Sequence, residues 1–211
     1  MKDLGMAPSK ITLHGSEISG HTHRVELMLR MLDLQYRFVS CPPQTRQTAE
    51  FLSMNPLGQV PVLQDGDVTL ADSNAILVFL AKRYGVGKGW LPEDAVSAAL
   101  VQRWLSIAAG EIAAGPNLAR LIRIRGMAAD YARAVAIAER ILRYMNQHLE
   151  RRTYLAAAHP TIADLACYSY VAMAGEGDIS LEAYPAVRAW LRRVETVPGF
   201  KAMPASPPFR G

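Results

Sequence analysis

The hydrophobic pattern of this 211-residue chain changes once, near residue 85, and this change constrains the fold more than any other feature. Before it, short alternating apolar runs at 11–14 and 36–39 flank a segment, 25–32, whose apolar residues recur at i, i+3, i+4 and i+7. Alternation predicts strands, and the longer period predicts an amphipathic helix. Strand, helix and strand at this spacing predict two parallel strands joined by a right-handed crossover.

The rest of the first part is predicted to hold a weaker helix, a hairpin and a closing helix, over 45–54, 60–70 and 73–84. The hairpin prediction depends on Asp65-Gly66, because a DG pair between apolar runs favours a tight turn. Asp72 is a favourable N-cap for the closing helix, and Gly85 a favourable stop.

After residue 85 the pattern is helical throughout. Helices are predicted from about 92 to Gly115-Pro116, over 128–149, from 161 onward, and over 186–195. The third begins at a capping box, Thr161–Asp164. We therefore predict an α+β plan, with a first domain over 1–85, a glycine-rich linker over 86–91 and an all-helical domain over 92–211.

Composition excludes several classes of function. The two cysteines, Cys41 and Cys167, lie far apart and outside any CxxC motif, which argues against a disulfide scaffold, a structural zinc site and a dithiol mechanism. No segment has the ~18 uncharged apolar residues of a transmembrane helix, and the first residues lack the plan of a signal peptide. We therefore expect a cytoplasmic protein that binds no membrane.

The net charge of +4 lies entirely after residue 85, in arginines spaced as on a solvated helix face. A nucleic-acid site would need a denser basic stripe with interleaved aromatic residues. We therefore expect no nucleic-acid partner.

Two dipeptides in the first part are candidate binding elements. Pro61 stands at a strand start and lacks the N–H of a sheet ladder, which leaves two interpretations: an edge-strand proline, or a cis peptide that turns the Val60 backbone toward an extended ligand. Asp72 and Ser73 begin a helix, whose unpaired amides and positive dipole end suit a carboxylate. Ser73 could donate to that carboxylate while Asp72 holds an ammonium group, unless Asp72 is simply a cap.

The turn 19–23 places hydroxyl and imidazole groups at the start of the first helix. A hydroxyl here could donate to a bound thiolate, because a helix N-terminus lowers a thiol pKa from its usual value of about 8.5. Alternatively, Ser19 or Thr22 is only an N-cap. Ser19 has no Asp–His pair for hydrolase chemistry. No carboxylate or cysteine completes a metal shell around His21 and His23, so we expect no metal and interpret both as surface side chains.

Five features in order together resemble the soluble glutathione transferase family, in particular its bacterial members with a serine at the active turn. They are the strand–turn–helix 14–27, the segment Asn55–Leu63 (similar to NPxGxVPxL), the segment Ala71–Leu77 (similar to ESxAI), the capping box 161–164, and the C-terminal segments 184–190 and 197–200. The resemblance covers nearly the whole chain and implies a thioredoxin-like βαβ-α-ββα first domain followed by an all-α bundle.

The resemblance also implies how reduced glutathione, as co-substrate, is bound. Val60 pairs with the cysteinyl part through its backbone, before a cis-Pro61. Asp72 and Ser73 hold the γ-glutamyl end, although the family more often has Glu in place of Asp72. Gln59 lies near the ligand backbone or the glycyl end.

The catalytic hydroxyl of the family falls at Ser19. Gly20 and His21 follow where a second Ser or a Cys is usual, so His21 or Thr22 could share or replace the role of Ser19.

These features predict a detoxifying transferase that conjugates the glutathione thiolate to an electrophilic, mostly apolar small molecule. The second-substrate pocket is expected between the domains, with walls from the active turn, from the long helix at Trp104, Ala108 and Ile112, and from the C-terminal tail. Family precedent implies a homodimer with the long helices at the interface. The alternatives are a glutathione-dependent peroxidase, isomerase or dehalogenase, or a noncatalytic glutathione-binding scaffold.

Overall fold

A mixed four-stranded sheet forms the centre of the first domain in the computed structural model, which describes residues 10–207. Its strands are β1 (Ile11–Gly15), β2 (Tyr36–Ser40), β3 (Val62–Asp65) and β4 (Val68–Ala71), in the spatial order β2-β1-β3-β4. β1 and β2 run parallel, and β3 is antiparallel to both of its neighbours. The register places Leu13 opposite Leu63, and both are fully buried.

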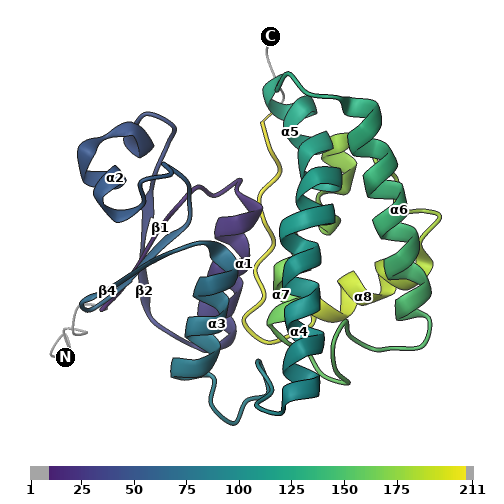
Figure 1. The fold of residues 1–211 in the computed structure, drawn as a ribbon, viewed down its shortest axis with the longest axis horizontal. Helices are drawn as coiled ribbons and strands as arrows, with labels where there is room; N and C mark the ends of the chain where they lie inside the picture. Colours follow the sequence, from purple (N-terminus) through teal and green to yellow (C-terminus); the bar gives the residue numbers. More distant parts are fainter. Residues whose placement is uncertain (1–9, 208–211) are drawn as a thin grey trace, which may run out of the picture.

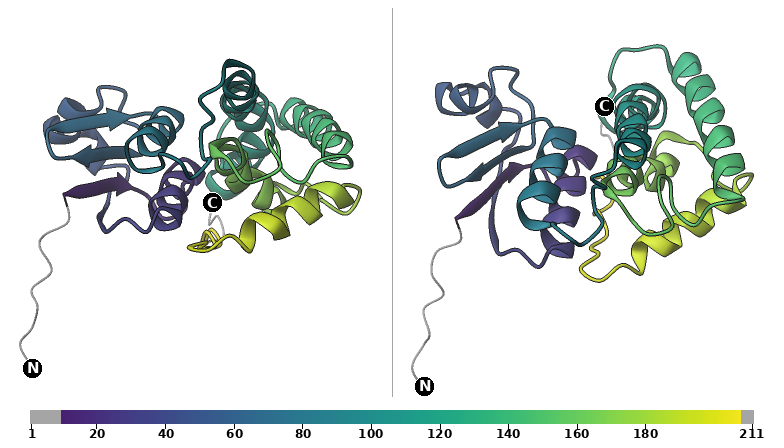
Figure 2. Two further views of the ribbon diagram at one scale, coloured as in Figure 1. Left: turned by 90° about the horizontal axis from the view of Figure 1, so that it is seen from below. Right: turned by 60° about the horizontal axis from the view of Figure 1, so that its bottom comes forward.

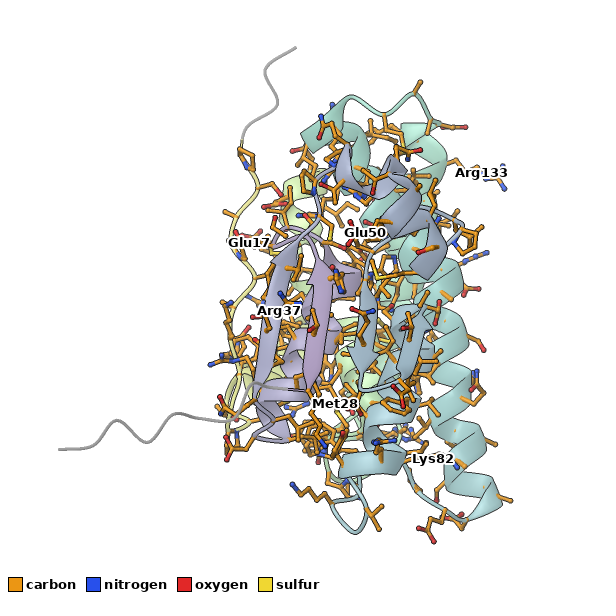
Figure 3. All side chains as sticks on the ribbon, turned by 90° about the vertical axis from the view of Figure 1, so that its left-hand side faces the viewer. Glu17, Met28, Arg37, Glu50, Lys82 and Arg133 are labelled. Carbon is orange, nitrogen blue, oxygen red and sulfur yellow. The ribbon has the colours of Figure 1, made fainter. Side chains whose placement is uncertain are left out.

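Helices cover one face of this sheet and one of its ends. They are α1 (Gly20–Met31), the 3-10 turn η1 (Thr45–Gln47), α2 (Ala49–Met54) and α3 (Ser73–Tyr84). Figure 3 shows the sheet from the face that carries the exposed Arg37, and α1 and α3 lie behind the sheet, on its opposite face. Val25 and Ile76, from the two helices, join the strand leucines in one buried core.

The second domain is entirely helical within the described residues and lies beside the first (Figures 1 and 2). Its elements are α4 (Ala95–Ile107), η2 (Ala108–Asn117), α5 (Leu118–Arg125), α6 (Tyr131–Leu149), α7 (Ile162–Ala172), η3 (Ala174–Gly177) and α8 (Pro185–Glu195). The predicted α+β plan is confirmed. No helix in the described range is long and apolar enough to cross a bilayer.

The predicted end of the long helix at Gly115-Pro116 is wrong. The chain passes through η2, a π-helical stretch that contains Pro116, and stays helical to Arg125, where Gly126 adopts a left-handed conformation. A wider π turn tolerates a proline that would break a regular α-helix. Gly115 serves packing instead, because a Cβ there would lie 2.7 Å from the backbone nitrogen of Ala138 in α6.

The two domains share a buried contact between α1 and α7. His23 is 2% exposed, and its ring nitrogens bond Ser169 Oγ (2.9 Å) and the Lys201 carbonyl (2.7 Å). The expectation that His23 is a surface residue is therefore wrong, because the second domain covers it. The C-terminal segment 201–207 has no regular secondary structure and runs from α1, where Lys201 bonds Glu26, to α5, where Arg120 donates to Ser206.

Asp164 organises the start of α7. Its buried carboxylate accepts the Leu155 N–H (3.0 Å), the Thr161 N–H (2.9 Å) and the Trp190 indole N–H (2.9 Å). It thereby joins α7, the preceding loop and α8. The predicted capping box with Thr161 is present.

We expect Asp164→Ala to lower the free energy of unfolding by about 3 kcal/mol or more, because several buried donors lose their acceptor and each costs about 1–3 kcal/mol. Asp130→Ala is the matched control. Asp130 also caps a helix, but it is exposed and, among residues 10–207, accepts only the Arg133 N–H, so its loss should cost about 1 kcal/mol. Chemical denaturation at one protein concentration measures both values. Similar losses in the two variants would contradict this role of Asp164.

Candidate functional site

The turn after β1 places Ser19 at the start of α1. Ser19 has extended backbone angles and is the N-cap, and its Oγ accepts the Thr22 N–H at 3.4 Å. Thr22 is 1% exposed, and its own hydroxyl accepts the Ser16 N–H at 3.2 Å. Thr22 therefore supports the turn from beneath, whereas Ser19 lies at its surface.

A cleft of about 220 Å³ brings the predicted binding residues together. Its lining contains Gln59, Val60, Pro61, Asp72 and Ser73, together with His21, Asn55, Leu57 and Ala71. We call this space the binding cleft. The Val60–Pro61 peptide is cis, which confirms the predicted cis bond, while the pairing of the Val60 backbone with a ligand stays a prediction. The Val60 backbone forms no hydrogen bond with another described residue.

Asp72 caps α3 from an unusual backbone conformation. Its φ of 69° lies in the left-handed region, which costs energy for a residue other than glycine. Its Oδ1 accepts the N–H groups of Asn74 and Ala75, both at 2.9 Å. The Ser73 amide remains at the positive end of the helix, and Ser73 lines the binding cleft.

A fully buried arginine lies behind Ser73. Arg24 donates from Nη1 to Ser73 Oγ (3.3 Å) and to Asn74 Oδ1 (3.0 Å). Its guanidinium also lies 5.8 Å from the Tyr170 ring centroid. Its Nε and Nη2 atoms have no hydrogen-bond partner among the described residues. The cleft therefore has beneath it a buried positive charge that forms no ion pair with a described residue.

His21 lies between the cleft and α7. Its Nδ1 is 3.2 Å from Ser73 Oγ, and its ring meets Tyr170 edge to face at 5.1 Å. Burial and the positive charge of Arg24 lower the pKa of His21 to about 4, although Asp72 acts in the opposite direction. His21 is therefore a neutral, largely enclosed side chain at neutral pH, and the surface interpretation is wrong for it as well.

A second space, of about 380 Å³, lies between the domains and shares His21, Gln59 and Val60 with the binding cleft. We call it the interdomain cavity. Its other lining residues are Ser16, Ile18, Ser19, Arg46, Asn117, Arg120, Leu121, Arg125, Met127 and Tyr170. A substrate in this cavity would lie against both Ser19 and the ligand of the cleft.

Tyr170, from α7, lies against Ser19. Burial raises the pKa of its hydroxyl, while the charge of Arg24 and hydrogen bonds with the His21 backbone and the Ser19 side chain act in the opposite direction. Gly20 makes this approach possible, because a Cβ there would lie 2.6 Å from the Tyr170 ring. Sequence reasoning missed Tyr170, since nothing in its local pattern marks it as different from a core residue.

The wall predicted from the long helix is wrong, whereas the active turn does line the interdomain cavity through Ser16, Ile18 and Ser19. Trp104, Ala108 and Ile112 are at most 1% exposed and belong to the core of the helical domain. The wall comes instead from Asn117, Arg120 and Leu121, at i, i+3 and i+4, one turn beyond the predicted end of the helix. Extending that helix past Pro116 would have revealed this face.

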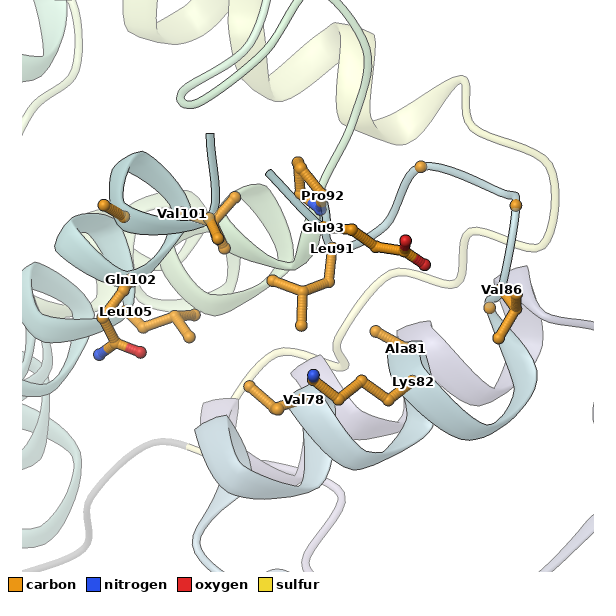
Figure 4. A pocket seen from close by; sticks show the side chains of 15 residues that line it. Val78, Ala81, Lys82, Val86, Leu91, Pro92, Glu93, Val101, Gln102 and Leu105 are labelled. Carbon is orange, nitrogen blue, oxygen red and sulfur yellow. The ribbon is translucent and has the colours of Figure 1, made fainter. Parts of the chain in front are cut away.

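A larger cavity, of about 1060 Å³, lies elsewhere. It lies between α3 and α4 at the linker, where Val78, Leu91 and Val101 line it (Figure 4). It shares no residue with the binding cleft or the interdomain cavity. Across residues 10–207, no three His, Cys, Asp or Glu side chains gather as metal ligands would.

Comparisons with known proteins identify relatives of both domains. Models of the glutathione S-transferase N-terminal and C-terminal domains match residues 13–89 and 128–193. The chain is 32% identical to glutathione S-transferase 3 of Zea mays, over 96% of this chain and 98% of that protein.

Solved structures are similar over the whole fold. A possible glutathione S-transferase from Rhodopseudomonas palustris has a TM-score of 0.86 at 33% identity, and the match covers 94% of this chain and 100% of that one. A glutathione transferase homolog from Drosophila mojavensis with bound glutathione has a TM-score of 0.79 at 29% identity, covering 90% and 89%.

We expect the His21 ring to titrate with a midpoint near 4. As the pH falls from 6.5 toward 4, His21 becomes protonated in the unfolded chain but stays neutral in the folded protein. Its contribution therefore lowers the free energy of unfolding across that pH range. Imidazole chemical shifts followed by NMR against pH measure the midpoint. A midpoint close to the ordinary value of 6.5 would contradict the enclosed, neutral state of His21.

Proposed function

This chain belongs to the glutathione S-transferase family and is a glutathione transferase, and we propose how its residues carry the reaction. One observation supports the proposal above all others. The binding cleft at Val60–Pro61 and Asp72–Ser73 opens onto Ser19 at the start of α1, and His21, Gln59 and Val60 line both spaces. A peptide held in the cleft can therefore present a thiol to a second substrate in the interdomain cavity.

Glutathione binds in an extended conformation along the binding cleft. The Val60 N–H and C=O pair with the cysteinyl residue. The γ-glutamyl carboxylate accepts hydrogen bonds from the amide and hydroxyl of Ser73, which lie above the buried charge of Arg24. The γ-glutamyl ammonium group pairs with the Asp72 carboxylate. Gln59 lies beside the glycyl half.

Ser19 stabilises the thiolate. Its Oγ accepts the Thr22 N–H, and its own O–H, which lies beside the Tyr170 oxygen, can rotate toward a bound ligand. The Ser19 proton then points to the sulfur, at the positive end of α1. His21, being neutral, orients Ser73 and adds no charge to the site.

The reaction itself is a displacement or addition by sulfur. The thiol proton leaves to solvent, the thiolate forms a carbon–sulfur bond with the electrophile, and any leaving group departs with its electron pair. The chain holds the two reactants together, which is where most of the rate enhancement arises. Ile18, Leu121 and Met127 provide apolar surface for the body of the electrophile.

The thiol must come from the ligand. Cys41 and Cys167 are buried, and burial raises the pKa of both thiols. Neither lines the binding cleft or the interdomain cavity. This supports glutathione conjugation over chemistry on a protein cysteine. We also propose a cytoplasmic location and a role in detoxification.

We propose that two copies associate through the outer face of α4. Val96 and Leu100 lie one turn apart on this helix, and their exposed fractions are 72% and 43%. Leu57, on the loop before β3, is 76% exposed. Large apolar side chains that no described residue covers suit an interface between copies.

We expect Ser19→Ala to raise the thiol pKa of bound glutathione and to lower kcat/KM at neutral pH about one hundred-fold, because a donor to the developing anion is lost. The thiolate ultraviolet absorbance and the conjugation of chlorodinitrobenzene measure these effects. Ser19→Thr should retain most of the activity.

Two results would contradict this assignment. If His21→Gln raised the thiol pKa and Ser19→Ala did not, His21 would be the activating group. If glutathione did not bind the parent protein, the proposed function would fail as a whole.

We expect the parent protein to sediment as a dimer and Leu100→Asp to sediment as a monomer, because a carboxylate in an apolar interface is costly to desolvate. Arg192→Asp, exposed on α8, is the control and should remain dimeric. Analytical ultracentrifugation distinguishes the states. A dimer that survives Leu100→Asp would place the interface elsewhere.

A further inference from the structure

The interdomain cavity is lined by cations without carboxylates. Arg46 comes from η1 in the first domain, and Arg120 and Arg125 come from α5 in the second. No Asp or Glu is among the lining residues. Arg120 is already neutralised, because its Nε bonds Glu176 at 2.6 Å and its Nη2 donates to Ile18 and Ser206.

Arg46 and Arg125 are the two cations of the interdomain cavity that no carboxylate of the described residues neutralises. Neither forms an ion pair within residues 10–207. The Arg46 Nε atom is buried and has no hydrogen-bond partner among those residues. After burial, the charge of Arg125 is the next largest cause that lowers the pKa of Arg46, so the two guanidiniums are close enough to repel each other. Two arginines beside one space attract an anion.

A third polar group faces the same cavity. Asn117 is 9% exposed, and its buried Oδ1 has no partner among the described residues. Buried polar groups are almost always hydrogen-bonded, so an unpartnered amide in a cavity wall indicates that a polar ligand group completes it. An asparagine amide can present either its oxygen or its N–H₂ group to that ligand.

We propose that the electrophile of this transferase carries an anionic group, such as a carboxylate, that binds between Arg46 and Arg125. This inference rests on the proposed function and deepens it by naming the substrate class. The apolar body of the electrophile lies against Leu121 and Met127, and its reacting carbon lies beside Ser19. Paired guanidinium donors match the geometry of a carboxylate.

The glycyl carboxylate of glutathione offers the same chemistry, so the test must separate the two sources. Chlorodinitrobenzoate and chlorodinitrobenzene, both with nitro groups ortho and para to chlorine, form a matched pair of probes. They differ only in the carboxylate. In both, the glutathione sulfur attacks the carbon that bears chlorine. A carbon–sulfur bond forms, the carbon–chlorine bond breaks, chloride leaves with the bonding electrons, and the thiol proton passes to solvent.

The variants are Arg125→Gln and Arg46→Gln, with Arg123→Gln as the control. Arg123 lies on the same helix but pairs with Asp178 at 2.7 Å and does not line the cavity. We expect the ratio of kcat/KM for chlorodinitrobenzoate to that for chlorodinitrobenzene to fall about ten-fold in each cavity variant, as for one lost charge-assisted contact. The ratio should be unchanged in Arg123→Gln. In the parent protein, the ratio should fall as salt is added.

Three outcomes would overturn the proposal. The ratio could stay constant in both cavity variants and in salt. The KM for glutathione, measured with chlorodinitrobenzene, could rise instead of the ratio falling, which would assign the pair to the glycyl carboxylate. Finally, the parent protein could bind glutathione but turn over neither probe, which would exclude conjugation of these electrophiles. If the parent protein did not bind glutathione, the proposed function itself would fail.

Discussion

The position of the site depends on the hydrogen bonds that the buried guanidinium of Arg24 forms. Within the first domain it joins α1 to Ser73 and Asn74 at the start of α3. It also lies on the ring of Tyr170 from α7, so it reaches the second domain. Burying a charge without a carboxylate partner is costly. The structure retains that cost where Arg24 places a positive field beneath Ser73, which is proposed to bind a carboxylate.

The electrostatics of the site follow from this arrangement. The N-termini of α1 and α3 point to the binding cleft, and Arg24 lies behind it. His21 is neutral and so adds no charge to the site, but its ring contacts Ser73 and orients it. A thiolate and a carboxylate are therefore both favoured over their protonated forms. Arg46 and Arg125 extend the same preference for anions into the interdomain cavity.

Local chemical signals explain which parts of the site could be predicted. The hairpin, the Asp72 cap and the capping box at Thr161 each depend on a few neighbouring residues, and all are present. The five binding-cleft residues were found because two short motifs contain them. The Gly115-Pro116 pair misled the prediction for the long helix, because packing against α6 and a π turn outweigh the usual helix-breaking effect.

The sequence by itself determined the architecture. Periodicity, capping residues and turn residues each depend on neighbours a few positions away, so the helices, strands and turns can be predicted without knowledge of the fold. It also identified Ser19 and the motif residues of the cleft. Only the tertiary structure decided the environment of His21 and His23, the contact of Tyr170 with Ser19, and the meeting of Arg46 with Arg125 across two domains. Burial and electrostatic coupling depend on residues far apart in the chain, and no local pattern records which of them will meet.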